Sequence, residues 1–197
     1  MKSGKIYCIM GKSASGKDTV YRELRRLMPE LKSYVMYSTR PMREGEQDGV
    51  TYHFVSEEEL SELEQEGRVI EKRVYHTVLG PWYYATVDDG QLSGDEDILM
   101  LTTPEGYMGL RSWFGDDRLR DIYIEIPDGE RLLRAVKREM QEREPHYAEV
   151  CRRFLSDCED FSEEKLFEAG ISHRYENLEL EACVRAIAED IKKAKDR

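Results

Sequence analysis

Short apolar runs alternate along the chain with longer segments in which apolar residues recur every three or four positions. The runs Ile6–Met10, Ile98–Leu101 and Ile122–Ile126 are nearly continuous, which is typical of strands buried on both faces of a parallel sheet. Helical spacing after the first run predicts a helix over Lys17–Met28, which Pro29 ends. Strands that alternate with helices predict an α/β fold of three layers with a parallel core sheet.

The rest of the chain adds elements of both kinds. Ser56 followed by Glu59 forms a capping box, which predicts the start of a helix that continues to about Glu66, where Gly67 ends it. The other predicted elements are a strand near Tyr34–Ser38, a helix from Pro104, a long helix from Asp128 to about Arg143, a second helix from near Ala148 and a helix over Leu180–Ala194.

Composition and charge narrow the class of protein. The 197 residues suit one domain with small insertions better than two independent domains. The formal net charge of −11 argues against nucleic acid or an anionic membrane as the main partner, because both need a positive face. Met1–Lys5 carries no apolar signal segment, so we expect a soluble, cytoplasmic protein without a membrane span. The four cysteines lack metal-ligand spacing, and we expect them to be reduced.

A glycine-rich segment, Gly11–Thr19, lies between the first predicted strand and the first predicted helix. It matches the phosphate-loop pattern GxxxxGK[ST] except at the last position, which is Asp18. In such a loop, backbone N–H groups and the helix N-terminus bind phosphate oxygens, and Lys17 adds a point charge. The alternative is a chance glycine-rich turn. The residues expected to bind a nucleoside triphosphate are Gly11, Ser13, Ala14, Ser15, Gly16, Lys17, Asp18 and Thr19.

Two arginines lie three residues apart in an extended, proline-containing stretch, Ser38–Glu46. Arg40 and Arg43 can close on one anion, because arginine forks bind phosphate in a bidentate manner, and the hydroxyl of Tyr52 can join them. The alternative is a solvated basic loop that balances the acids around it.

The order of these motifs resembles the guanylate kinase family. The phosphate loop is followed by Ser-Thr-Arg-Pro-x-Arg-x-Gly-Glu, Gly-x-x-Tyr-x-Phe, Val-Ile-Glu at residues 69–71 and Tyr-Tyr-Ala-Thr at residues 83–86. The resemblance covers nearly the whole chain and implies transfer of the γ-phosphoryl group of ATP to GMP or dGMP, with Mg²⁺. It also implies a P-loop core (1–35, 89–127 and 162–197), a monophosphate-binding insertion (36–88) and a helical lid (128–161).

The resemblance implies roles for individual residues. Arg40, Arg43, Tyr52 and Tyr84 would hold the phosphate of GMP, and Glu71 and Thr86 would recognise guanine. Asn177 would lie near the adenine of ATP, after a last core strand over Ile171–Tyr175. Lys17 and Arg40 would act in catalysis with the lid arginines Arg138, Arg143 and Arg153. For the lid arginines, the alternative is a helix face laced with i,i+4 ion pairs.

The chemistry of guanine supports the role of Glu71 independently. Guanine presents its N1–H and its exocyclic amine side by side, and one carboxylate can accept from both, whereas adenine offers an acceptor at N1. The alternative is that Glu71 faces solvent and pairs with Lys72 or Arg73.

The chain departs from the family pattern at several positions. Met36 replaces a serine that contacts guanine, and extra residues including Gly80–Trp82 lie before Tyr84. Thr103 stands where the family has an acid, and Asp18 stands where a P-loop has a hydroxyl. We interpret this as an exchange in which Asp18 binds or orients Mg²⁺; the alternatives are a structural ion pair or a slowed enzyme. These departures leave open a kinase for another phosphorylated small molecule, or a binding module without turnover.

Overall fold

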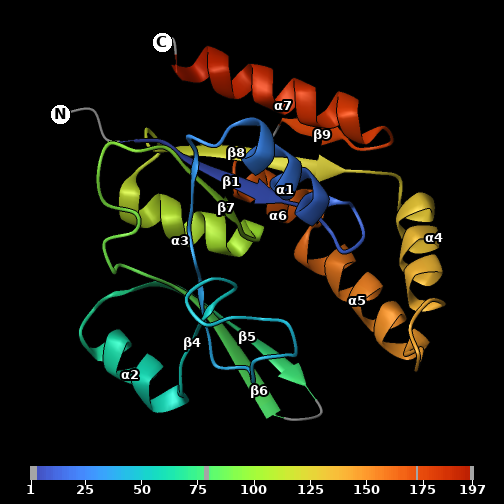
Figure 1. The fold of residues 1–197 in the computed structure, drawn as a ribbon, viewed down its shortest axis with the longest axis horizontal. Helices are drawn as coiled ribbons and strands as arrows, with labels where there is room; N and C mark the ends of the chain where they lie inside the picture. The colour runs from blue at the N-terminus through green and yellow to red at the C-terminus, as the bar shows by residue number, and fades with distance from the viewer. Residues whose placement is uncertain (1–3, 78–79, 172, 196–197) are drawn as a thin grey trace.

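The central strand β1 (Ile6–Met10) is buried along its whole length because helices cover both faces of its sheet. Its side chains alternate between two apolar clusters: Cys8 and Met10 lie in one, and Tyr7 and Ile9 lie in the other. The structure is a computed structural model that describes residues 4–77, 80–171 and 173–195 (Figure 1).

The core sheet has the strand order β2-β7-β1-β8-β9, and all its pairings are parallel. Helices α1 and α7 pack on one face, and α3 and α6 pack on the other. The predicted three-layer α/β fold is thereby confirmed. No described helix is long and apolar enough to cross a membrane. The core elements are α1 (Lys17–Leu27), β2 (Lys32–Ser33), β7 (Ile98–Leu101), α3 (Pro104–Phe114), β8 (Leu119–Glu125), α6 (Glu163–Glu168), β9 (Arg174–Glu176) and α7 (Leu180–Lys195).

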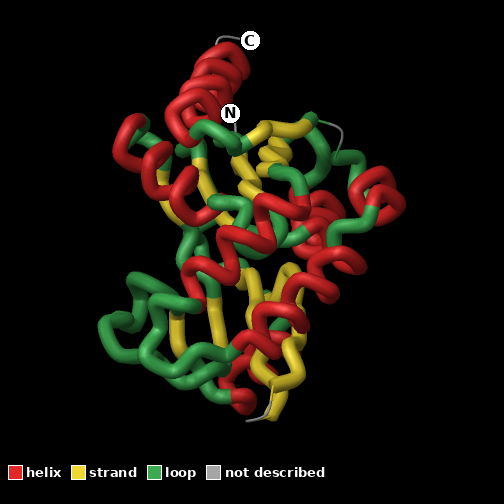
Figure 2. The backbone as a smooth tube through the Cα atoms, turned by 90° about the vertical axis from the view of Figure 1, so that its right-hand side faces the viewer, coloured by secondary structure: helices red, strands yellow, loops and turns green. Residues whose placement is uncertain are grey.

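A second, mixed sheet of order β4-β3-β6-β5 lies beside the core with helix α2, at the end away from α7 (Figures 1 and 2). The capping box of α2 is present: Ser56 Oγ accepts from Glu59 N at 3.1 Å, and the Glu59 carboxylate accepts from Ser56 N at 2.7 Å. The elements of this part are β3 (Tyr37–Ser38), β4 (His53–Phe54), α2 (Glu57–Gln65), β5 (Val69–Thr77) and β6 (Gly80–Val87).

The predicted strand near Tyr34–Ser38 is wrong as a single element, because the chain crosses there from one sheet to the other. β2 ends at Ser33 in the core sheet, and β3 begins at Tyr37 in the small sheet. The buried side chain of Tyr34 fixes the crossing: its hydroxyl donates to Val87 O at 3.1 Å and accepts from Val87 N at 2.7 Å.

Helix boundaries in the second half of the chain also differ from those predicted. Helix α4 (Asp128–Glu139) ends before Arg143, and α5 (Tyr147–Asp160) follows it as the second arm of a helical hairpin. Helix α6 was not predicted. The last core strand, β9, lies later than Ile171–Tyr175, a range whose residue 172 is outside the described residues.

Helix α3 approaches β5 of the small sheet closely through two glycines. A Cβ added to Gly109 would lie 2.7 Å from Glu71 Cβ, and one added to Gly106 would lie 3.3 Å from Glu71 Oε2. Both contacts are tight, so the junction between the core and the small sheet requires small residues on this helix.

We expect Gly109→Ala to lower the free energy of unfolding by about 1–3 kcal/mol, because the added methyl group must push β5 away from α3. Gly129→Ala in α4 is the matched control, since nothing lies within 4 Å of its added Cβ. That change should be neutral or stabilising by up to about 1 kcal/mol. Urea unfolding of both variants measures the difference; equal effects would show that the close approach does not constrain the fold.

Candidate active site

The glycine-rich segment joins β1 to α1 at the carboxyl edge of the core sheet, as the sequence predicts. Gly16 caps α1 with φ 89°, and Ala14 is the only described non-glycine residue with a positive φ, at 61°. The Asn177 side chain donates to Ser15 O at 2.7 Å, and a Cβ on Gly16 would lie 2.3 Å from Asn177 Nδ2. The backbone of the loop is therefore held in one shape from outside, which suits an anion-binding loop.

Asn177 supports the loop rather than standing free to meet a base. It is buried, and its backbone carbonyl oxygen accepts from Arg134 Nη2 at 3.0 Å. Its predicted place near adenine stays a prediction, and Arg134 of α4 also reaches the loop, since a Cβ on Gly16 would lie 3.9 Å from Arg134 Nη1.

Lys17 and Asp18, next to each other in the loop, form an ion pair at 3.3 Å. The Asp18 side chain is 71% exposed, so this contact leaves most of the carboxylate open to solvent. Thr103, the other member of the predicted exchange, caps α3 by accepting from Gly106 N at 3.2 Å. The described residues contain no group of three His, Cys, Asp or Glu side chains arranged to hold a metal.

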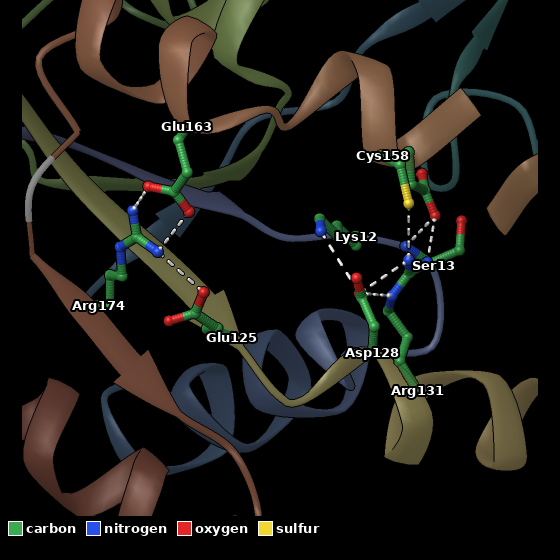
Figure 3. Close-up of polar contacts among 9 residues, drawn as sticks. Lys12, Ser13, Glu125, Asp128, Arg131, Cys158, Glu163 and Arg174 are labelled. Atoms are coloured by element: carbon green, nitrogen blue, oxygen red, sulfur yellow. Dashed lines mark hydrogen bonds and ion pairs between the residues drawn. The ribbon is translucent and has the colours of Figure 1, made fainter. Parts of the chain in front are cut away.

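The helical hairpin is fastened to the phosphate loop by a carboxylate (Figure 3). The backbone N–H of Ser13 donates to Asp157 Oδ2 at 2.8 Å, and the same oxygen accepts from Arg131 Nη1 at 3.0 Å. Arg131 also pairs with Asp128, which Lys12 of the loop approaches to 3.4 Å. Sequence reasoning missed Arg131 and Asp157. The i,i+3 spacing of Asp128 and Arg131 is a visible signal, but nothing in the sequence places Asp157 near Ser13.

A second cluster of charged side chains lies on the side of Lys12 away from Asp128 and Arg131 (Figure 3). Arg174 of β9 pairs with Glu125 of β8 at 2.9 Å and with Glu163 at the start of α6. A cavity of about 340 Å³ lies between the two clusters, and Lys12 and Ser15 are among the residues that line it.

The predicted lid arginines gather around a larger cavity of about 690 Å³. Arg138, Arg143 and Arg153 line it from the hairpin, together with Ser13 of the phosphate loop and Arg43 of the small-sheet part. Among the residues that the structure describes, Arg138 and Arg143 form no ion pair. Arg153 pairs with Glu149 at i,i+4, and Arg152 and Arg153 hold the Glu149 pKa at about 2. The ion-pair alternative thus describes Arg153 and not the other two.

Arg40 and Arg43 meet at one anion, which is the carboxylate of Glu46. Both terminal nitrogens of Arg40 donate to Glu46, at 2.5 and 2.7 Å, and the backbone N–H of Arg43 donates to it at 2.8 Å. Hydrogen bonding to Arg40 lowers the pKa of Glu46 to about 2. The Arg40 guanidinium is buried against the ring of Tyr52, 5.0 Å from its centroid, and Tyr84 packs edge-on to Tyr52 at 5.6 Å. Three predicted phosphate ligands therefore lie together, while Arg43 points to the larger cavity.

Glu71 and Thr86 are in direct contact, since Thr86 Oγ1 donates to Glu71 Oε1 at 2.6 Å. Glu71 does not face solvent: its side chain is 6% exposed. It is nevertheless paired with Arg73, as one of the alternatives predicted. Sequence reasoning mentioned Arg73 only as this partner and gave it no place in the site.

The phosphate loop, the cavity lined by arginines and the helical hairpin together define a P-loop nucleotide-binding protein. The sequence matches the family model described as "Guanylate kinase" over residues 3–193. The chain therefore belongs to the guanylate kinase family, and the predicted resemblance is confirmed.

Individual relatives agree with this family. The chain is 31% identical over 158 residues to the guanylate kinase of Syntrophotalea carbinolica, covering 80% of this chain and 71% of that protein. It is 27% identical over 190 residues to the guanylate kinase of Chlorobium luteolum, covering 93% of this chain and 89% of that protein. The crystal structure of guanylate kinase from Anaplasma phagocytophilum superposes with a TM-score of 0.69 at 19% identity, covering 98% of this chain and 87% of that one, and it supports the fold.

Arg131 is the structural centre of the hairpin's attachment, because its side chain is 2% exposed and contacts two carboxylates. We expect Arg131→Ala to lower the free energy of unfolding by about 3–5 kcal/mol, since it leaves the carboxylate of Asp157 without its charged partner. Arg138→Ala removes an arginine of the same helix that pairs with no described residue and should change stability by less than about 0.5 kcal/mol. Chemical denaturation tests this; similar losses for both would show that the buried ion pairs contribute nothing specific.

Proposed function

We propose that this chain transfers the γ-phosphoryl group of ATP to GMP or dGMP, giving ADP and GDP or dGDP. The observation that carries the proposal is the cavity of about 690 Å³ beside the phosphate loop, where arginines of the hairpin and Arg43 lie together with four glutamates of the hairpin. Membership of the guanylate kinase family supports GMP as the acceptor, and the contact between Glu71 and Thr86 is consistent with that role.

Phosphoryl transfer needs positioning and charge neutralisation rather than a covalent intermediate. In the proposed mechanism, backbone N–H groups of the loop and Lys17 bind the phosphates of ATP. Arg40, Tyr52 and Tyr84 hold the acceptor phosphate, with Arg43 at the edge of the larger cavity. Arg138 and Arg143 form no ion pair with any described residue, so they are the hairpin arginines best able to neutralise charge on the transferring group.

A coupled assay of ADP release with GMP, dGMP, AMP, CMP and UMP tests the proposal. We expect GMP and dGMP to be the preferred acceptors, and Lys17→Ala to lower turnover with them about 100-fold or more. If GMP is no better than AMP, the chain does not select guanine and the proposed acceptor is wrong. If GMP binds normally in calorimetry without any turnover, the chain is a binding module. Turnover of a different phosphorylated acceptor would show a kinase of another specificity.

Asp18 is the residue that we propose holds or orients Mg²⁺, directly or through water. Its exposed carboxylate fits this role, because Mg²⁺ usually takes one or two protein carboxylates and completes its shell with phosphates and water. When bound, Mg²⁺ would neutralise phosphate charge. In this proposal Asp18 supplies a carboxylate that the family has at the position of Thr103. The ion pair with Lys17 is the competing role for Asp18.

A double-mutant cycle with Asp18→Ser and Thr103→Asp separates the two roles. Each single change should lower turnover and weaken its dependence on Mg²⁺ concentration, and the pair should recover both, with a coupling energy of about 1–3 kcal/mol. Thr103→Asp keeps a side chain that can cap α3, so the fold should tolerate it. Simply additive effects, or an Mg²⁺ dependence that Asp18→Ser leaves unchanged, would make Asp18 a structural residue.

A further inference from the structure

Glu71 is enclosed on several sides at the junction between the two sheets. Gly106 and Gly109 of α3 pack directly against its side chain, so that a Cβ on Gly106 would lie 3.3 Å from Glu71 Oε2. Thr86 of β6 donates to Oε1 from the neighbouring strand. With 6% of its side chain exposed, the carboxylate can meet a ligand only along the edge that these groups leave open.

Arg73 occupies that edge of the carboxylate. Its Nε donates to Glu71 Oε2 at 3.0 Å and its Nη2 donates to Oε1 at 3.2 Å, which is a bidentate, charge-neutralising pair. Arg73 and Glu71 stand two residues apart on one strand, so their side chains share a face of the small sheet. The pair therefore belongs to the strand itself and forms without any contribution from a ligand.

The contact that Arg73 makes is the contact that guanine would make. Guanine offers N1–H and its 2-amino group as two parallel donors, and this pattern needs both oxygens of one carboxylate on one edge. Arg73 presents two parallel N–H donors to the same two oxygens. Both cannot use that edge at once, so a guanine base must displace the guanidinium or leave both its N1–H and its 2-amino group without the carboxylate.

Further contacts hold Arg73 in place. Nη1 donates to Thr103 Oγ1 at 3.2 Å, Nη2 lies 3.9 Å from Met36 Sδ, and the side chain is only 9% exposed. Met36 and Thr103 are two of the positions at which this chain departs from the family pattern. Met36, Thr103 and Arg73 thus form one contact network beside Glu71.

We propose that Arg73 is a specificity-determining residue that closes the bidentate edge of Glu71, so that the base pocket gains little from a 2-amino group on the purine. The proposal rests on the proposed function, because it concerns the acceptor site of the same reaction. It means that the chain discriminates only weakly between GMP and IMP, whose base is guanine without the 2-amino group.

The test compares kcat/KM for GMP and IMP in three proteins: wild type, Arg73→Ala and Lys72→Ala. The wild-type ratio should lie within about threefold of unity, and Arg73→Ala should raise it about tenfold or more, because guanine then donates two hydrogen bonds to a free carboxylate. Lys72→Ala is the matched control: it removes the adjacent positive charge, which pairs with Glu64 of α2 instead. Its ratio should equal that of wild type. A general loss of folding lowers both activities together and leaves the ratio unchanged.

A strong wild-type preference for GMP that Arg73→Ala does not increase would overturn the proposal. If Arg73→Ala fails to fold, Arg73→Lys replaces it: a single ammonium keeps the positive charge but cannot form the two parallel hydrogen bonds of the guanidinium, so the GMP-to-IMP ratio should still rise above the wild-type value. An unchanged ratio would contradict the proposal.

Calorimetric binding of GMP and IMP separates this proposal from the proposed function. Selective tightening of GMP in Arg73→Ala without turnover in any protein would support the specificity role and reject the kinase activity. Turnover of GMP with a GMP-to-IMP ratio that Arg73→Ala leaves unchanged would support the kinase activity and reject the specificity role of Arg73. If neither nucleotide binds to any of the proteins, both proposals are wrong.

Discussion

A carboxylate buried between two sheets constrains much of the structure. Removing a charge from water is costly unless the charge is paired and hydrogen-bonded, so Glu71 must have donors close by. Arg73 and Thr86 provide them from the small sheet, and the glycines of α3 let the core helix come close enough to exclude water. The same contacts fix where the small sheet stands relative to the core, and hence where an acceptor can lie relative to the phosphate loop.

Several groups that the family uses for nucleotides already have partners within this chain. Arg40 forms an ion pair with Glu46, and Glu71 forms one with Arg73. The backbone N–H of Ser13 donates a hydrogen bond to Asp157. A ligand that uses these groups exchanges one hydrogen bond for another, so its net gain is smaller than the gross strength of the new contact. The carboxylates of Glu46 and Asp157 also keep the groups that they contact in position.

The sequence was sufficient for the architecture and for the phosphate-binding elements. Nearly continuous apolar runs identify β1, β7 and the second half of β8, because parallel strands covered on both faces are mostly apolar. The loop before Lys17 was identifiable because its chemistry lies in consecutive residues. The crossing at Tyr34 was not, because a strand that changes sheets has the same local pattern as a continuous one. The contact of Asp157 with Ser13 joins residues 144 positions apart, which periodicity cannot detect.

The surroundings of Glu71 show why sequence motifs predict phosphate binding more reliably than they predict recognition of a base. Phosphate is bound by many weakly directional donors, so the loop and its arginines tolerate a shifted register or a changed neighbour. A base is recognised by two or three hydrogen bonds whose donors and acceptors must remain free, so one nearby side chain can change the outcome. In this chain the glutamate expected to recognise guanine is present, and its neighbour on the same strand face neutralises it. In the specificity role that we propose, base recognition by that glutamate depends on Arg73, a position outside the motif.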